Sequence, residues 1–334
     1  MGAKVAINGF GRIGRLVLRS ALKHKADLDF VSINDIADAH TLAHLFKYDS
    51  VHGVYPGEVT ATDDSITIDG KKLNVTAIKD PSQLPHKENG VDLVVESTGL
   101  FRSKEKAGMH ISAGAKKILI SAPAKGEVDG NFVRGVNCAQ YDKSKHDIIT
   151  IGSCTTNCLA PVAKVLHDNF KIENALMTTI HSYTSSQRIL DLPHKDLRRA
   201  RAAAVSMIPT TTGAAKAISL VVPPLEGKID GMAIRTPTPC GSLIDLVATF
   251  EKDVTKDSIN AAMKKAAEEG SLKGILKYET DPIVSNDIVG NPYSSIYDAE
   301  LTMVMGKRLA KVLSWYDNEW GFSTRLVEML GMML

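Results

Sequence analysis

The chain has few of the features that mark membrane, secreted or metal-binding proteins. No apolar run reaches the roughly 18 residues that cross a bilayer, and a glycine-rich turn follows the first eight residues in place of a signal-peptide core. Only four cysteines occur, at positions 138, 154, 158 and 240, and they form no pattern of paired zinc ligands. We therefore expect a cytoplasmic protein with reduced thiols, no membrane partner and no metal.

A charge excess of one sign is also missing. Forty basic and 38 acidic residues leave a net charge of +2, so no overall field attracts nucleic acid, and we expect no dedicated nucleic-acid partner. The hydrophobic share of 44% and the charged share of 23% are ordinary for a globular protein. At about 150 residues per domain, 334 residues predict two domains.

The two halves of the chain differ in their pattern. Short apolar runs at 4–7, 30–34, 93–96, 117–121 and 148–151 alternate with helical segments, which predicts a Rossmann-type, doubly wound α/β domain with a parallel sheet over 1–152. Longer strands at 175–181, 231–235, 243–251 and 309–315, with helices at 155–169, 210–220 and 257–269, predict an α+β catalytic domain over 153–319 with a mixed or antiparallel sheet. We expect a last helix, about 320–334, to pack back on the first domain.

The first chemical signal is a glycine-rich turn between the first strand and the first helix. Gly9 permits the tight turn, Gly11 lets the backbone approach a pyrophosphate, and Gly14 allows close packing of helix on strand. Asp35 follows at the end of the next strand, where a carboxylate can accept the ribose hydroxyls of NAD. The alternative is a glycine-rich turn with a helix-capping aspartate and no ligand.

The second signal is Cys154, which opens a helix directly after the strand 148–151. The first-turn amides and the helix dipole would lower the pKa of this thiol and stabilise an oxyanion. A buried structural role is the usual fate of a cysteine, and it fits the other three. A thiolate needs a base, and His181 closes the strand 175–181, but spacing alone does not select it among ten histidines.

The third signal is a group of basic residues. Arg188, Arg198, Arg199 and Arg201 form either a solvated face or an anion pocket, since guanidinium groups bind phosphate bidentately. The segment Thr210–Gly213 is expected to open a helix and to supply amides and hydroxyls of the kind that bind phosphate. Arg235 ends an apolar strand.

Nine segments together resemble one family. They are NGFGRIGR (8–15), KYDSVHG (47–53), ESTG (96–99), ISAPAK (120–125), SCTTNCLAP (153–161), HSYT (181–184), DLPHKDLRRARAA (191–203), PTTTGAAKA (209–217) and SWYDNEWG (314–321). In this order they resemble the phosphorylating glyceraldehyde-3-phosphate dehydrogenases, and most closely the bacterial and plastid branch. The resemblance implies a glycolytic and gluconeogenic oxidoreductase that uses NAD and inorganic phosphate to convert D-glyceraldehyde 3-phosphate to 1,3-bisphosphoglycerate through a cysteine thioester.

The resemblance also implies roles for single residues. Cys154 would be the nucleophile, and His181 its base and later proton donor. Thr184 and Arg235 would hold the C3 phosphate of the substrate, and Ser153, Thr155, Arg201, Thr212 and Gly213 the inorganic phosphate. NAD would be held by Gly9, Gly11, Arg12, Ile13, Gly14, Asp35, Lys79, Ser121 and Asn318. A loop of about 182–204, the S-loop, would reach a neighbouring subunit's cofactor in a homotetramer.

Two other functions remain open at this point. An erythrose-4-phosphate dehydrogenase would share the fold and the cysteine, but would hydrolyse its thioester. A non-enzymatic Rossmann-type redox or nucleic-acid-binding regulator would use the basic segment 188–201 to bind phosphates, with no use for a cysteine at a helix start.

Overall fold

The computed structural model describes residues 2–334, and these form two compact units. The first unit comprises the chain up to Phe132, Gln140–Gly152 and Ser323–Leu334, and the second comprises Val133–Ala139 and Ser153–Phe322. That a short segment after Phe132 belongs to the second unit was not predicted. No helix within residues 2–334 is both long and apolar enough to cross a membrane.

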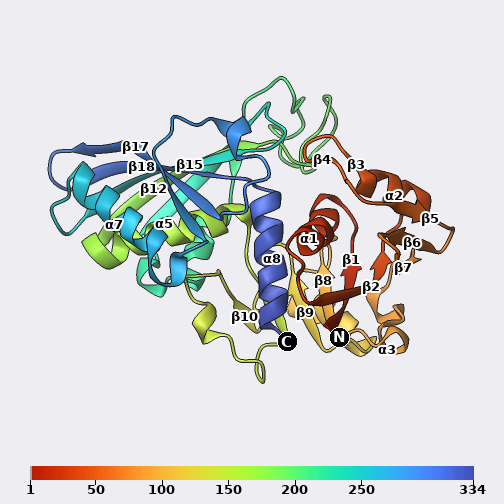
Figure 1. Cartoon of the computed structure of the whole chain (residues 1–334). Helices are drawn as coiled ribbons and strands as arrows, with labels where there is room; N and C mark the ends of the chain where they lie inside the picture. The colour runs from red at the N-terminus through yellow and green to blue at the C-terminus, as the bar shows by residue number, and fades with distance from the viewer. Residues whose placement is uncertain (1) are drawn as a thin grey trace. The chain divides into compact units, whose positions relative to one another are not determined.

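The first unit is built on a nine-stranded sheet (Figure 1). Seven strands run parallel in the order β10 (Gly130–Asn131), β11 (Ile148–Thr150), β9 (Lys117–Ile120), β8 (Leu93–Glu96), β1 (Ala3–Asn8), β2 (Leu28–Asn34) and β7 (Lys71–Thr76). Two antiparallel strands, β6 (Ser65–Ile68) and β5 (Val59–Ala61), extend its edge. The parallel, doubly wound sheet is thus confirmed, and β1, β2 and β8 end at one edge, where their side chains can form a binding site.

Two of the helices in this unit begin at residues whose side chains cap them. The helices are α1 (Arg12–Lys23), α2 (Ala39–Lys47), α3 (His86–Asn89) and α4 (Lys104–Ser112), and the unit also takes in α8 (Trp320–Met332) from Ser323 onward. Asp38 caps α2 and Ser103 caps α4 through their side-chain oxygens. Thr324 Oγ1 in α8 lies 3.2 Å from Ser20 Oγ in α1, within the same unit. A small hairpin, β3 (Tyr48–Asp49) with β4 (Gly53–Val54), follows α2.

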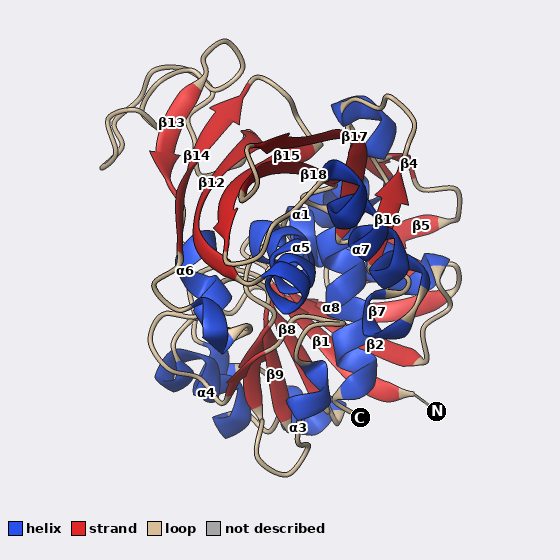
Figure 2. Ribbon diagram, turned by 90° about the vertical axis from the view of Figure 1, so that its left-hand side faces the viewer, coloured by secondary structure: helices blue, strands red, loops and turns tan. Residues whose placement is uncertain are grey.

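The second unit contains a mixed seven-stranded sheet with helices packed on it (Figure 2). Its order is β13 (Ile208–Thr211), β14 (Ile229–Thr236), β12 (Ile172–Ser182), β15 (Ser242–Phe250), β18 (Leu309–Tyr316), β17 (Ser295–Met305) and β16 (Leu276–Glu279). The helices α5 (Cys154–Phe170) and α7 (Lys256–Glu268) cover one face, and apolar residues such as Leu159, Leu166 and Leu246 fill the core between them. The α+β architecture is confirmed.

One predicted element of this unit is wrong. The range 210–220 was expected to be a single helix, but Thr210 and Thr211 lie in β13, which pairs with β14 at the edge of the sheet. Only α6 (Ala214–Ala217) and a 3-10 turn follow. The β-branched threonines favour the extended backbone that this edge pairing stabilises.

Candidate active site

The thiol of Cys154 lies in the first turn of α5, as the sequence predicts. Ser153 caps this helix, since its Oγ accepts a hydrogen bond from Thr156 N at 3.0 Å. Cys154 is half-buried and its thiol is free. The first-turn amides of α5 therefore lie next to the sulfur, where they can stabilise negative charge on a reacting group.

One of the ten histidines faces this thiol. His181 lies near the end of β12 with 3% of its surface exposed, and its Nε2 is 3.5 Å from Cys154 Sγ. On the other side of the ring, Nδ1 is 2.7 Å from the Ser182 carbonyl oxygen. The carbonyl oxygen only accepts, whereas Arg235 Nη1, which lies 2.7 Å from the same Nδ1, only donates, so the two contacts favour opposite tautomers of the ring. In the tautomer with its proton on Nδ1, Nε2 is free to take the thiol proton.

The surroundings favour a neutral thiol and a neutral imidazole. Burial, reinforced by the positive charge of Arg235, lowers the pKa of His181 to about 3. Burial also raises the pKa of the Cys154 thiol, although Arg235 and Thr155 oppose that rise. The expectation of a lowered thiol pKa is therefore not met, because loss of water around the sulfur outweighs the helix start. The sulfur becomes nucleophilic as its proton passes to Nε2.

Arg235 brings a positive charge to the same place. It lies near the end of β14 directly opposite His181 in the parallel pairing of β14 with β12. Its Nη1 lies 2.7 Å from His181 Nδ1 and 3.0 Å from the Ser182 carbonyl oxygen. Its Nε is buried and has no hydrogen-bond partner within residues 2–334. A buried guanidinium N–H without a partner is a donor that an anion could accept from.

The arginines of the loop between β12 and β13 divide into two kinds. Arg199 Nε donates to Thr210 Oγ1 at 2.8 Å, and its positive charge helps to lower the pKa of Arg235, although burial is the larger cause. Both arginines pair with an acid, Arg199 with Asp196 at 3.5 Å and Arg201 with Asp191 at 2.9 Å, but the Arg199 side chain is 21% exposed and the Arg201 side chain 65%. Arg199 thus belongs to the same electrostatic environment as Arg235, and Arg201 stabilises the loop at its surface.

The other predicted phosphate contacts lie in turns and caps. Thr184 follows β12, and its amide donates to Gln187 Oε1 at 3.0 Å. Thr212 Oγ1 accepts from Ala214 N at 3.2 Å, and Gly213 is the cap of α6. Thr155 Oγ1 lies 2.9 Å from the hydroxyl of Tyr316.

The glycine turn of the first unit has the expected geometry. Gly9 has φ of +91°, a left-handed conformation that favours glycine, and a Cβ there would lie 2.6 Å from Thr98 N. A Cβ on Gly14 would lie 2.2 Å from Gly9 O, so only glycine lets α1 pack this closely on the turn. Gly11 is the cap of α1.

A pocket of about 500 Å³ opens beside this turn, and its lining includes Gly9, Gly11, Asp35 and Lys79. Asp35 Oδ2 accepts from Phe10 N at 2.7 Å, which fixes the carboxylate at the end of β2. A glycine turn, a helix N-terminus and a strand-end carboxylate around one pocket fit the pyrophosphate and the ribose of a dinucleotide.

The remaining predicted cofactor contacts lie in both units. Arg12 and Ile13 open α1, where Arg12 forms an ion pair with Asp49 at 2.7 Å. Ser121 follows β9, and its amide donates to Glu96 O at 2.9 Å. Asn318 belongs to the second unit, where its Oδ1 accepts from Gly241 N at 3.1 Å.

Comparison with known proteins agrees with this geometry. Residues 3–104 match the family model for the NAD binding domain of glyceraldehyde 3-phosphate dehydrogenase, and residues 153–318 match the model for its C-terminal domain. The glyceraldehyde-3-phosphate dehydrogenase of Geobacillus stearothermophilus is 58% identical over 329 residues, which cover 98% of this chain and 97% of that protein. The chain belongs to the glyceraldehyde-3-phosphate dehydrogenase family.

Two further members of the glyceraldehyde-3-phosphate dehydrogenase family are similar to the same extent. That of Thermotoga maritima is 58% identical over 333 residues, which cover 99% of each chain. That of Streptomyces coelicolor is 56% identical over 329 residues, which cover 98% of each chain. The family resemblance stated from nine sequence segments is confirmed over nearly the whole chain.

Sequence reasoning missed one residue of this glyceraldehyde-3-phosphate dehydrogenase site. The hydroxyl of Tyr316 lies 2.9 Å from Thr155 Oγ1 and 2.8 Å from Thr179 Oγ1, and its ring meets the His181 ring edge-on, with centroids 5.9 Å apart. Tyr316 thereby joins the helix that carries Cys154 to the strand that carries His181. The alternation of β18 could have shown that this tyrosine faces the core, but not that its hydroxyl meets two threonines.

Proposed function

We propose that this protein oxidises and phosphorylates D-glyceraldehyde 3-phosphate with NAD and inorganic phosphate, and so forms 1,3-bisphosphoglycerate. The observation that carries the proposal is the placement of Cys154 Sγ 3.5 Å from His181 Nε2, with Arg235 beside the same histidine. A thiol, a base and an anion-binding side chain together suit a phosphorylated aldehyde. The family membership supports the same substrate.

The reaction follows from these side chains. His181 Nε2 takes the thiol proton while the sulfur of Cys154 attacks the aldehyde carbon, and the proton passes on to the new oxyanion to give a hemithioacetal. His181 then withdraws the hydroxyl proton as hydride leaves the carbon, which leaves a thioester. NAD would be held by the pocket of Gly9, Gly11 and Asp35 in the first unit, and it would supply the acceptor for that hydride. A phosphate oxygen attacks the thioester, the thiolate leaves, and the acyl phosphate is released.

Two anions must be held, the substrate's own phosphate and the incoming one. We assign the first to Arg235 with Thr184, because the buried Nε of Arg235 has no partner within residues 2–334. For the second, the sequence-based set is Ser153, Thr155, Arg201, Thr212 and Gly213. The contact of Arg199 with Thr210 favours Arg199 as the charged member of this set in place of the exposed Arg201.

The decisive experiment follows NADH formation from glyceraldehyde 3-phosphate with and without inorganic phosphate. We expect turnover to need phosphate, and Cys154→Ser to abolish it with NAD binding intact. Cys158→Ser is the matched control, since that thiol lies one turn further on, is buried with a pKa raised to about 12, and contacts Ser295. Similar losses in both variants would refute Cys154 as the nucleophile. Turnover independent of phosphate, with hydrolysis of the thioester, would favour erythrose 4-phosphate as the substrate.

We further propose a cytoplasmic homotetramer. Four large apolar side chains of the S-loop are exposed at 58–83%, namely Ile189, Leu190, Leu192 and Leu197. Such a concentration on one loop marks a surface that another protein covers. Sedimentation equilibrium of the purified protein tests the assembly, and a monomer at micromolar concentration would contradict it.

A further inference from the structure

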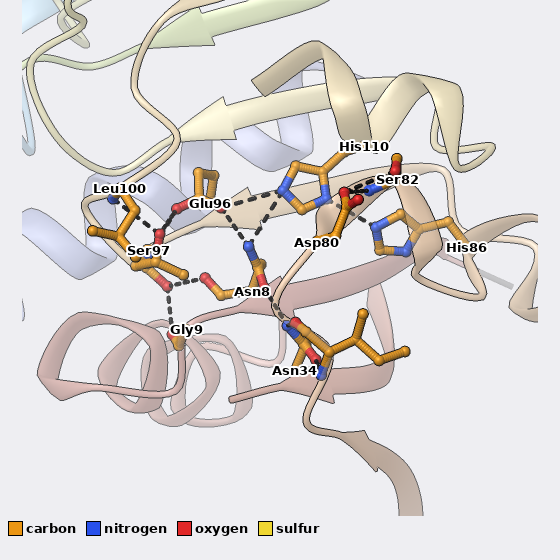
Figure 3. A network of polar contacts seen from close by, with 12 residues as sticks. Asn8, Gly9, Asn34, Asp80, Ser82, His86, Glu96, Ser97, Leu100 and His110 are labelled. Carbon is orange, nitrogen blue, oxygen red and sulfur yellow. Dashed lines mark hydrogen bonds and ion pairs between the residues drawn. The ribbon is translucent and has the colours of Figure 1, made fainter. Parts of the chain in front are cut away.

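A row of polar side chains joined by hydrogen bonds ends three neighbouring strands (Figure 3). Asn8, Glu96 and Asn34 end the neighbouring strands β1, β8 and β2, and the register places Asn8 directly opposite both of the others. Asn8 is 2% exposed and Glu96 is 1% exposed. Asn8 and Asn34 line the pocket beside the glycine turn, whereas Glu96 does not line it and contacts residues that do.

The hydrogen bonds in this row all run in one direction. Asn34 Oδ1 accepts from the backbone amide of Ile78 at 2.9 Å, and a backbone amide only donates, so the orientation of the Asn34 side chain is fixed. Its Nδ2 therefore donates to Asn8 Oδ1 at 2.7 Å. Asn8 Nδ2 in turn donates to Glu96 Oε2 at 2.6 Å. The carboxylate is the terminal acceptor on which both amide orientations depend.

The other oxygen of Glu96 holds the opposite wall of the pocket. Oε1 accepts from the Thr98 amide at 2.9 Å and from the Thr98 hydroxyl, which itself accepts from Leu100 N at 3.0 Å. Thr98, Leu100 and Phe101 line the pocket. One buried carboxylate thus connects two strand ends with the loop that faces them.

Two histidines complete the environment of the Glu96 carboxylate. His110 Nε2 lies 3.2 Å from Glu96 Oε2, and His86 Nε2 lies 3.0 Å from His110 Nδ1. Burial and the neighbouring His110 lower the pKa of His86 to about 4, so His86 is neutral at pH 7. A carboxylate oxygen accepts, so His110 Nε2 is the donor in its contact with Glu96. Four donors around two oxygens offset the cost of burying an ionised carboxylate.

We propose that Glu96 is a positioning residue for NAD, which holds Asn8, Asn34 and the loop of Thr98 in the arrangement that binds the cofactor. This rests on the proposed function, because it takes NAD as the occupant of the pocket. Glu96 itself makes no contact with the cofactor. It acts by fixing which atoms of its neighbours face the pocket.

The test replaces one oxygen of this carboxylate by an NH₂ group. In Glu96→Gln the new donor must face either Asn8 Nδ2 or the Thr98 amide, and both of those are donors. Asn8 cannot turn over without breaking its bond with Asn34. Because a charge-assisted bond is replaced by a donor–donor contact, we expect the calorimetric Kd for NAD to rise by about tenfold or more. The KM for the aldehyde and kcat at saturating NAD should stay within about twofold.

Asp129→Asn is the matched control. This acid lies in the same unit, accepts from the amides of Asp147 and Ile148, and pairs with Lys104, so the same chemical change costs similar bonds away from the pocket. It should lower the melting temperature and leave the Kd for NAD unchanged. A folded Glu96→Gln variant with the wild-type Kd would overturn the proposal, and so would an equal rise of Kd in both variants.

A second pair of variants covers the case in which Glu96→Gln does not fold. Thr98→Ser keeps the hydroxyl that donates to Oε1, and Thr98→Val removes it with little change of shape. We expect Ser to bind NAD like the wild type and Val to bind it several-fold more weakly. Equal Kd values for the two would overturn the proposal. A wild-type protein that does not bind NAD at all would instead refute the proposed function.

Discussion

The hydroxyl of Tyr316 connects the nucleophile and the base, so its removal should affect catalysis more than folding. Thr155, one partner, directly follows Cys154 in α5, and Thr179, the other, precedes His181 by two residues in β12. Tyr316 is fully buried, and burial raises the pKa of its hydroxyl well above the usual value, so the group stays neutral and can both donate and accept. Tyr316→Phe removes this one connection and keeps the ring.

The expected loss of stability in Tyr316→Phe follows from the two hydrogen bonds that the variant lacks. Two buried hydrogen bonds contribute about 0.5–1.5 kcal/mol each, so the free energy of unfolding should fall by about 1–3 kcal/mol. At about 2–4 °C per kcal/mol for a domain of this size, the melting temperature should drop by several degrees. A shift of a reacting group by about 1 Å costs up to about a hundredfold in rate. We therefore expect kcat to fall about ten- to a hundredfold while the KM for NAD stays unchanged.

Tyr297→Phe is the control that separates the two effects. Its hydroxyl is also fully buried in the second unit and contacts Asn260 Oδ1 and Thr302 Oγ1. It should lose similar stability and keep its kcat. The assay is steady-state NADH formation beside thermal unfolding for both variants. Equal losses of kcat, or a Tyr316→Phe variant with full kcat, would refute the reasoning.

Three further predictions concern the phosphates, the cofactor and pH. Arg235→Ala should raise the KM for the aldehyde, and Arg199→Ala the KM for phosphate, each about tenfold or more. Arg201→Ala should change neither KM much, because that side chain is exposed and paired with a surface acid. A phosphate KM that rises only in the Arg201 variant would restore the sequence-based assignment. Asp35→Ala should weaken NAD binding and narrow the preference over NADP, since the carboxylate repels a 2′-phosphate, and equal wild-type kcat/KM for both cofactors would contradict this. Because the pKa of His86 falls from 6.5 to about 4 on folding, the unfolded chain binds more protons between these values, and stability should decline as the pH falls through that window. His86→Gln should remove this contribution, at most about 3 kcal/mol, from the fall of the free energy of unfolding with pH, as measured by urea titrations. If the free energy of unfolding depends on pH in the same way in the variant and the wild type, the effect is excluded.

Much of the fold was predictable because its signals are local. The glycine turn and the apolar runs around it specify β1, α1 and β2, and the structure has them at Ala3–Asn8, Arg12–Lys23 and Leu28–Asn34. Strand β17 (Ser295–Met305) was not predicted. It carries the acids Asp298 and Glu300, and its register with β18 shifts after Asp298. An irregular strand has no clean alternation of polar and apolar residues to read.

The candidate site was predictable in its types of residue and less so in their pairing. A cysteine at a helix start is a local feature, so Cys154 could be singled out directly. The choice of His181 rested on family resemblance, because the contact depends on how α5 packs on β12. The choice between Arg199 and Arg201 depends on the course of a long loop, which places one side chain against Thr210 and the other at the surface.

The His181–Arg235 pair and the Asn8–Glu96 pair both lie at strand ends, and this explains why the sequence could not reveal which residues face each other. His181 lies opposite Arg235 in the pairing of β12 with β14, and Asn8 lies opposite Glu96 in the pairing of β1 with β8. Sequence patterns locate a strand end only to within about two to four residues, while a register slip of one residue turns a side chain to the other face of the sheet. The sequence can therefore show that a polar residue ends a buried strand. Which polar residue faces it depends on a register that the buried apolar faces of the whole sheet decide together.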